Sequence, residues 1–196
     1  MSLNDTALMM ALSASGLLIM ALIAAGVNRG QVSWRWIVIA VLAVALHDVA
    51  LTRFGHLLPP WPTLDADWNV SGKLYAIVAV LMMAALLRMP RSELGLVIGT
   101  GARARLGWIV CIGLVAALAG LALVMPGERA PWSTLAYQAT LPGLAEELFY
   151  RGLLLALLMR AFSPAGDKAA VLTAAVMVTA LFVQAHVLIA GDGRVE

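Results

Sequence analysis

Six long runs of apolar residues, separated by shorter polar stretches, dominate the chain. They cover residues 7–27, 36–51, 74–87, 107–125, 141–162 and 169–190. A transmembrane helix needs roughly 20 predominantly apolar residues at a rise of about 1.5 Å each. The third run is shorter, and we expect Lys73 and Arg88 at its ends to extend toward the membrane interfaces. The pattern predicts an all-α fold, a polytopic helical membrane bundle of about six transmembrane helices.

Composition indicates that lipid, rather than water, surrounds most of this chain. Of the 196 residues, 62% are hydrophobic and 12% are charged, whereas about 25% of residues are charged in a typical soluble domain. So much apolar surface cannot be hidden inside a globule of roughly 200 residues. A net charge of +2 also provides no basic patch of the kind that binds nucleic acid. Both a soluble enzyme and a nucleic-acid-binding protein are therefore disfavoured.

The chain shows no internal repeat and no low-complexity linker, so residues 1–196 are expected to form a single membrane domain. Its orientation can be predicted from lysine and arginine in the short loops. The loops after the first, third and fifth runs hold eight of these residues, and the opposite loops hold four. This excess predicts that the N-terminus lies outside the cytoplasm.

Small residues inside the apolar runs are expected to serve packing. The single cysteine, Cys111, is predicted to be a small buried residue, and it leaves no disulfide and no cysteine metal site. Gly113, Gly120 and Gly152 are predicted to allow helices to approach closely.

Three charged side chains interrupt the fifth apolar run. Glu146, Glu147 and Arg151 lie in one hexapeptide, and each costs at least about 2.5–3.5 kcal/mol inside a membrane unless it is paired or reaches water. Glu147 and Arg151 are spaced i,i+4 with the glutamate first, the order that favours an ion pair on one helix face. Glu146 has no such local partner, although Tyr150 could offer it a hydrogen bond. An inner carboxylate of this kind is a candidate general base.

The sixth run carries a histidine that can lie beside Glu146. If the fifth helix begins near Leu141, with Pro142 in its first turn, Glu146 lies roughly 7 Å inside the membrane. Residues 128–140 would then form an interfacial stretch. His186 lies about 6 Å from the same membrane face when counted back from the end of the sixth run. The two depths predict that Glu146 and His186 occupy one layer of a helical hairpin.

These residues form two motifs with a known counterpart. Glu146, Glu147 and Arg151 read Glu-Glu-x-x-x-Arg, and Phe182 and His186 read Phe-x-x-x-His. The pair of motifs resembles the CPBP family, the CAAX-prenyl-protease and bacteriocin-processing intramembrane endopeptidases, also called the Abi family. The resemblance implies that Glu146 activates the water that attacks a peptide bond and that His186 positions that water or binds a metal. It implies that Glu147 and Arg151 hold the helix geometry.

The resemblance covers residues 88–190, including Glu93-Leu94-Gly95-Leu96 ahead of the fourth run, and residues 1–87 are less characteristic. The family also has a third motif, a histidine followed four residues later by asparagine or aspartate on a later helix. Residues up to Glu196 do not contain it. We therefore expect a shortened chain, a substitute from elsewhere in the chain, or an inactive protein.

The absence of the third motif also bears on the choice of mechanism. A catalytic zinc is usually held by three protein ligands, and the two motifs offer chiefly Glu146 and His186. A glutamate-activated water without a cofactor is therefore favoured, and a zinc ion bound by Glu146 and His186 is the alternative.

Further side chains are candidates for the site. Tyr150 and Phe182 are expected to support it, more as packing residues than as reactive groups. His47 and Asp48 in the second run fall in the same half of the membrane as Glu146, judged by the rise per residue. The simpler expectation is that these two satisfy each other, and a catalytic role for His47 is the speculative alternative.

The expected function is that of an intramembrane endopeptidase, which hydrolyses a peptide bond near the membrane face of a membrane-anchored or exported precursor. Its partners would be that peptide or protein and the lipid bilayer. The resemblance implies a bacterial cytoplasmic membrane, and the predicted orientation opens the site to the extracytoplasmic side. Two alternatives stand beside it: a catalytically inactive relative that binds or scaffolds a partner, and a transporter that relays protons or ions.

Overall fold

The computed structural model describes residues 3–28, 31–54, 69–97, 99–124, 132–187, 190–191 and 194–195. The α-helices of the described residues are α1 (Leu3–Val27), α2 (Trp34–Val49), α4 (Val70–Leu86), α5 (Ala102–Val124), α6 (Trp132–Glu146), α7 (Leu155–Phe162) and α8 (Asp167–Val187). Between them lie the π-helical segments η1 (Ala50–Phe54) and η2 (Glu147–Leu154), and the 3-10 turn η3 (Ser163–Ala165). β1 (Ala190–Gly191) and β2 (Arg194–Val195) form one short antiparallel pair.

The predicted membrane-spanning segments are all helical. Five of them are long and apolar enough to cross a membrane: Thr6–Val27, Trp34–Phe54, Ala104–Leu121, Ala139–Ala165 and Lys168–Val187. The third predicted span is the shorter apolar helix α4 of 17 residues. These helices confirm the all-α class and indicate an integral membrane protein.

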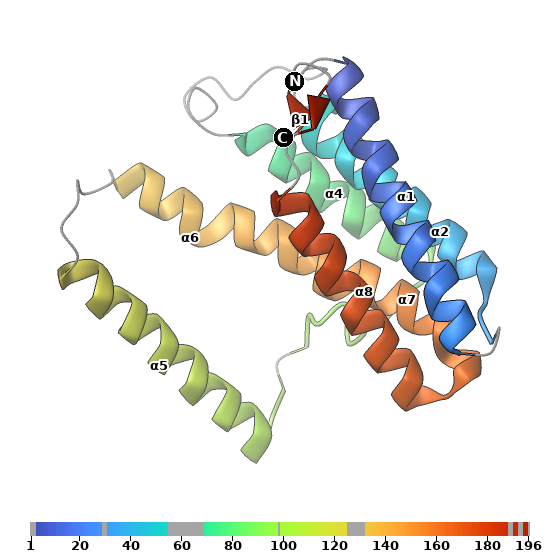
Figure 1. Cartoon of the computed structure of the whole chain (residues 1–196). Coiled ribbons are helices and arrows are strands. Elements are labelled where there is room, and N and C mark those ends of the chain that lie inside the picture. The colour runs from blue at the N-terminus through green and yellow to red at the C-terminus, as the bar shows by residue number, and fades with distance from the viewer. Residues whose placement is uncertain are drawn as a thin grey trace.

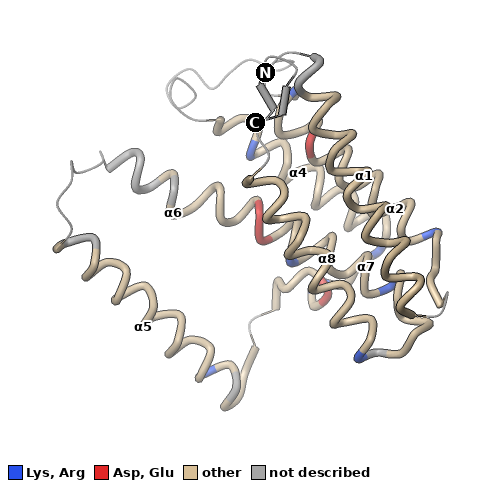
Figure 2. The backbone as a smooth tube through the Cα atoms, viewed as in Figure 1, with Lys and Arg blue, Asp and Glu red and all other residues tan. Residues whose placement is uncertain are grey.

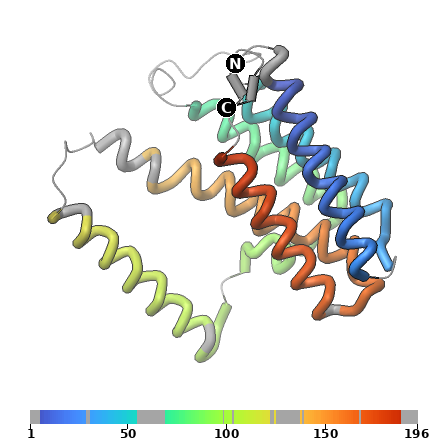
Figure 3. The backbone as a smooth tube through the Cα atoms, in the orientation of Figure 1, coloured from blue at the N-terminus to red at the C-terminus, as the bar shows by residue number. Residues whose placement is uncertain are grey.

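The core lies where α1, α2, α7 and α8 pack together (Figure 1). Its largest fully buried side chains come from three of these helices and from η2: Leu17, Ile37, Phe149, Leu153, Leu154, Leu157, Leu158 and Phe162. The C-terminal helix α8 lies against the first helix, α1, as Figure 3 shows. The first span therefore packs against the sixth span and helps to hold it in place.

Helix α5 stands apart from this bundle (Figure 1). None of the span Ala104–Leu121 is buried, and Cys111 is exposed, so its predicted burial is wrong. A Cβ added at Gly113 or Gly120 would meet nothing within 4 Å, so neither glycine permits a close helix approach. The apolar side chains of α5 therefore face outward, where a membrane would surround them with lipid.

The fifth span differs from the prediction in where it begins. The helix starts at Trp132 rather than near Leu141, and Pro142 lies inside it. The described part of the predicted interfacial stretch, from residue 132 onward, is helical, and residues 128–131 lie outside the described residues. Proline in a helix removes one backbone hydrogen bond, and the helix widens into the π-helical η2 directly after Glu146. Such π-helical segments are frequent at functional sites.

A turn ahead of α5 docks onto η2 and α7. Glu93 forms an ion pair with Arg160, with 2.8 Å between Oε2 and Nη2. Leu94 is buried, and its carbonyl oxygen would lie 3.1 Å from a Cβ at Gly152. Gly152 therefore does permit a close approach, as predicted, but to this turn rather than to another helix.

Candidate active site

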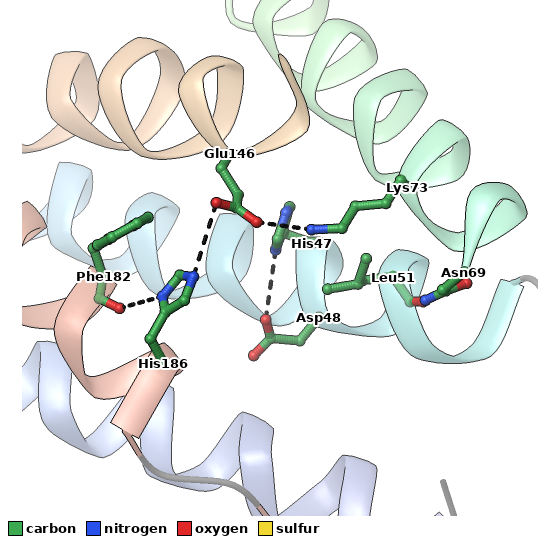
Figure 4. A network of polar contacts seen from close by, with 8 residues as sticks. All are labelled: His47, Asp48, Leu51, Asn69, Lys73, Glu146, Phe182 and His186. Atoms are coloured by element: carbon green, nitrogen blue, oxygen red, sulfur yellow. Dashed lines mark hydrogen bonds and ion pairs between the residues drawn. The ribbon is translucent and has the colours of Figure 1, made fainter. Parts of the chain in front are cut away.

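Glu146, the last residue of α6, lies between two other helices. Its Oε1 accepts a hydrogen bond from Nζ of Lys73 on α4 at 2.9 Å. Its Oε2 lies 3.8 Å from Nε2 of His186 on α8. Figure 4 shows the carboxylate with the ammonium on one side and the imidazole on the other. The predicted neighbours Glu146 and His186 are thus brought together by the fifth and sixth spans, and Lys73 joins them from α4.

Depth along the helices does not by itself explain this meeting. Glu146 follows 14 residues of α6, whereas His186 is the last residue but one of α8. The two come together because α6 runs obliquely to α8 (Figure 1). α7 packs against α8 after the turn at η3. α6, which precedes α7, diverges from α8 toward its own start.

Glu147 and Arg151 form the predicted ion pair. Oε1 of Glu147 lies 2.9 Å from Nη1 of Arg151, and the two side chains are 54% and 75% exposed. This exposure separates the pair from Glu146, whose side chain is 26% exposed. Figure 2 shows the acidic end of α6 among largely uncharged helices. The pair therefore lies beside the Glu146 carboxylate without forming an ion pair with it.

A small cavity of about 150 Å³ opens beside these acidic residues. It is lined by residues of the fifth and sixth spans: Gly143, Glu146, Glu147, Tyr150, Arg151, Val178, Thr179 and Phe182. Two carboxylates and a hydroxyl-bearing threonine thus face the same space. The cavity is large enough for several waters or a short piece of peptide backbone.

His186 is oriented by its own helix. Its Nδ1 lies 2.8 Å from the carbonyl oxygen of Phe182, one turn earlier. A carbonyl oxygen only accepts hydrogen bonds, so Nδ1 carries the proton in this contact. In the neutral ring Nε2 is then the unprotonated nitrogen, and it is the atom that faces Glu146.

Aromatic rings support the histidine. The Phe182 ring lies against His186 with 4.2 Å between the ring centroids, and Tyr150 meets Phe182 edge-on at 5.3 Å. No hydrogen bond joins Tyr150 to Glu146 among the described residues, so the predicted contact is replaced by ring packing. Phe182 therefore packs on His186, and Tyr150 packs on Phe182; both also line the cavity beside Glu146.

His47 lies on the inner side of the site. Its ring stacks on Phe149 with 3.8 Å between centroids, and it lies edge-on to Tyr150 at 6.4 Å. Nδ1 of His47 is 3.5 Å from Oδ1 of Asp48. Nδ1 and the other oxygen of Asp48 are buried without a hydrogen-bond partner among the described residues. The two side chains are close, as expected, but they satisfy each other only in part.

Lys73 lies near the N-terminus of α4, which is capped by Asn69. The Asn69 side chain accepts a hydrogen bond from the Gly72 amide at 3.0 Å and donates one to the carbonyl oxygen of Leu51 at 2.8 Å. Leu51 belongs to η1, so this cap ties α4 to the end of the second span (Figure 4). A Cβ at Gly72 would collide with the Leu51 carbonyl oxygen and with the Asn69 side chain. Only glycine fits there without displacing the cap.

Gly72→Ala is expected to lower the free energy of unfolding by about 1–3 kcal/mol, the usual range for overpacking a tight site. Thermal or denaturant unfolding of the purified protein in detergent measures the change. Gly113→Ala is the matched control, because it adds a methyl group where nothing lies within 4 Å. The control is expected to be neutral or slightly stabilising, since alanine favours helix. Equal effects of the two variants would contradict the role assigned to Gly72.

The end of α8 is tied to α1 by a side chain between the two motif residues. Nε2 of Gln184 donates a hydrogen bond to the carbonyl oxygen of Leu12 at 2.9 Å. A Cβ at Gly16 would collide with the Gln184 side chain, so this contact also needs a glycine. The first helix thereby helps to hold the last turn of α8, where His186 lies.

The donor atoms near Glu146 are few. Among the described residues there is no group of three His, Cys, Asp or Glu side chains that could hold a metal ion. Glu146 and His186 offer two donors, and Lys73 already occupies one oxygen of Glu146. A second cation at this carboxylate would be repelled by the ammonium.

Sequence reasoning missed Lys73. The sequence predicted a lysine that extends to the membrane interface, but its side chain is 16% exposed and turns inward to Glu146. The signal that could have found it was the unpartnered Glu146, which requires a cation from somewhere in an apolar bundle. The sequence did not indicate which of the lysines and arginines would pair with Glu146.

The fold and the site define an integral membrane protein whose helices bring a carboxylate and a histidine together. In the comparison with family models, residues 128–192 match the Rce1-like model, described as type II CAAX prenyl endopeptidase Rce1-like. This match confirms the predicted family resemblance for the segment that carries both motifs. Comparisons with curated proteins and with solved structures give no match. At the level of the family, the match supports a CAAX-type intramembrane protease.

Proposed function

We propose that this protein is an intramembrane endopeptidase in which Glu146 activates a water molecule for attack on a peptide bond. The observation that carries the proposal is the position of Glu146, between Lys73 and His186 and beside a cavity between the fifth and sixth spans. An ionisable group inside a span is costly, and such groups usually mark functional sites. The family match in the same segment agrees with this interpretation.

The two acceptor atoms that face each other support a bound water as the nucleophile. Oε2 of Glu146 accepts hydrogen bonds, and so does Nε2 of a neutral His186 whose Nδ1 donates to Phe182. A water molecule can donate one hydrogen to each of them. Its lone pairs then point away from both acceptors and toward a substrate carbonyl.

The chemical step follows from this arrangement. Glu146 takes a proton from the water as the water oxygen bonds to the carbonyl carbon, which gives a tetrahedral intermediate. The carbon–nitrogen bond then breaks, and the protonated Glu146 returns its proton to the leaving amine. The products are a carboxylic acid and an amine, and Glu146 is again a carboxylate.

A mechanism without metal fits the donor set better than a zinc mechanism. Zinc enzymes of this kind use three protein ligands and one water, whereas Glu146 and His186 offer two. The ammonium of Lys73 supplies the positive charge that a metal would bring to Glu146. We therefore propose that the water is activated by the carboxylate alone.

The substrate can lie along the seam between the fifth and sixth spans. A larger cavity of about 620 Å³ lies on the same pair of helices and shares Arg151 with the small one. Its lining combines the apolar side chains of Leu155, Met159 and Val171 with the charged side chains of Glu93, Arg151 and Arg160. An apolar stretch of a membrane-anchored precursor suits the apolar part of this lining. We propose such a precursor as the substrate, in a bacterial cytoplasmic membrane with the site open to the extracytoplasmic side.

His186→Ala tests the proposed function. We expect kcat for cleavage of a fluorogenic membrane-anchored peptide to fall about 100-fold, because the water loses one of its two acceptors. Chelators such as EDTA and 1,10-phenanthroline should leave the wild-type rate unchanged. Inhibition by chelators that is reversed by added zinc would contradict the mechanism without metal. Complete inactivity of the wild type toward a broad peptide set would favour the inactive, partner-binding alternative.

A further inference from the structure

Among the described residues, Lys73 is the one side chain in direct ionic contact with Glu146 that neither motif contains. It comes from α4, in the part of the chain that the family match does not cover. Its ammonium lies 2.9 Å from Oε1 of Glu146, and the two side chains are only 16% and 26% exposed. An ion pair so poorly exposed is strongly coupled, because little water screens it.

The contact selects which oxygen of Glu146 can react. Oε1 is occupied by the ammonium, and Oε2 is the oxygen that lies toward His186 (Figure 4). The carboxylate is planar, so fixing one oxygen limits the rotation of the other. Neither Lys73 nor His186 is among the residues that line the small cavity, so Lys73 contacts Glu146 without occupying that space.

The backbone that carries Lys73 is held firmly enough for the side chain to fix Glu146. The residue lies near the start of α4, directly after Gly72, whose amide donates a hydrogen bond to the Asn69 side chain. The Asn69 cap, the Leu51 carbonyl and the missing side chain of Gly72 hold that turn against η1. The backbone amide of Lys73 itself donates to the carbonyl oxygen of Asn69 at 3.2 Å.

We propose that Lys73 is a positioning residue of the proposed peptidase: it holds Oε1 of Glu146 in place and leaves Oε2 as the oxygen that accepts the proton of water. This inference rests on the proposed function. It extends the site to α4, which neither the motifs nor the family match includes. It also assigns the charge compensation of Glu146 to this chain's own lysine.

The test compares three variants reconstituted in liposomes with the fluorogenic peptide. Lys73→Met is expected to lower kcat about 100-fold while KM changes less than about threefold, because the residue acts on the base rather than on the bound substrate. Lys73→Arg should recover activity to within about tenfold of the wild type, since it restores the positive charge. Lys168→Met, which removes an exposed lysine at the start of α8, should leave both constants unchanged. A kcat for Lys73→Met within about threefold of the wild type would overturn the proposal.

A second measurement distinguishes the loss of the Lys73–Glu146 contact from a general loss of folding in the variant. Melting temperatures in detergent are compared for the wild type, Lys73→Met, Glu146→Gln and the double variant, a cycle that isolates the coupling of the two residues. We expect Lys73→Met to lower the melting temperature much less when Glu146 is already glutamine. Additive losses of melting temperature would contradict an energetic coupling between Lys73 and Glu146. Clear coupling together with an inactive wild type would instead refute the proposed function, and with it the catalytic purpose of Lys73.

Discussion

Glu146→Gln is expected to lower the rate of peptide cleavage about 10³-fold, since the amide cannot accept the proton of water. The substitution keeps the shape of the side chain, and its carbonyl oxygen can still accept a hydrogen bond from Lys73. The rate is measured with purified protein in liposomes, alongside a melting curve that verifies folding. The loss should appear in kcat, because the proposed role of Glu146 lies in the chemical step.

Glu147→Gln is the matched control for this variant. It makes the same chemical change at the neighbouring carboxylate, which is 54% exposed and paired with Arg151. Exposed ion pairs contribute about 0–1 kcal/mol to stability, so the variant should remain folded and within about tenfold of the wild-type rate. Wild-type turnover by Glu146→Gln, or a larger loss in Glu147→Gln, would exclude Glu146 as the base.

Phe149→Ala is expected to cost about 2–3 kcal/mol of unfolding free energy, somewhat below the 3–5 kcal/mol typical of soluble cores. Phe149 is 1% exposed and its ring stacks on His47, so its removal leaves a cavity that lipid cannot fill. The cost is reduced because lipid already solvates apolar side chains when helices separate in the membrane. Unfolding in mixed detergent micelles measures the change.

Leu118→Ala provides the comparison for Phe149→Ala. Leu118 lies on α5 and is 57% exposed, so the truncated site remains in contact with lipid or detergent. We expect a change below about 0.5 kcal/mol, the range of substitutions that leave no cavity. Similar losses in both variants would mean that Phe149 is not part of a packed core.

The helices were predictable because their signal is local. Apolar runs long enough to span a bilayer appear in the sequence itself, and lipid permits little besides helix in such runs. The same holds for Glu147 and Arg151, since residues spaced i,i+4 meet on any helix. The start of the fifth helix was predicted wrongly because Pro142 was taken to mark a first turn, whereas the structure tolerates it inside a helix that widens soon afterwards.

The contacts between helices were predictable only in part. The sequence predicted from counted depths that Glu146 and His186 share a layer, and the two residues do meet. The depth counted for Glu146 was wrong, because α6 begins at Trp132. The sequence did not indicate Lys73, because a lysine at the end of an apolar run extends to the interface or turns inward according to what its neighbours offer. That choice depends on the Asn69 cap and on the space at Gly72.

By itself, the sequence determined that this protein is a helical membrane protein with a few charged residues inside its spans. Hydrophobic length and the cost of charge in lipid act on each segment separately, so no tertiary information is needed for them. The tertiary structure alone decided which cation meets Glu146, which of its oxygens remains free, and which residues hold His186 in place. These depend on how α1, α4, α6 and α8 cross, and crossing is set by packing between segments rather than by the composition of any one of them.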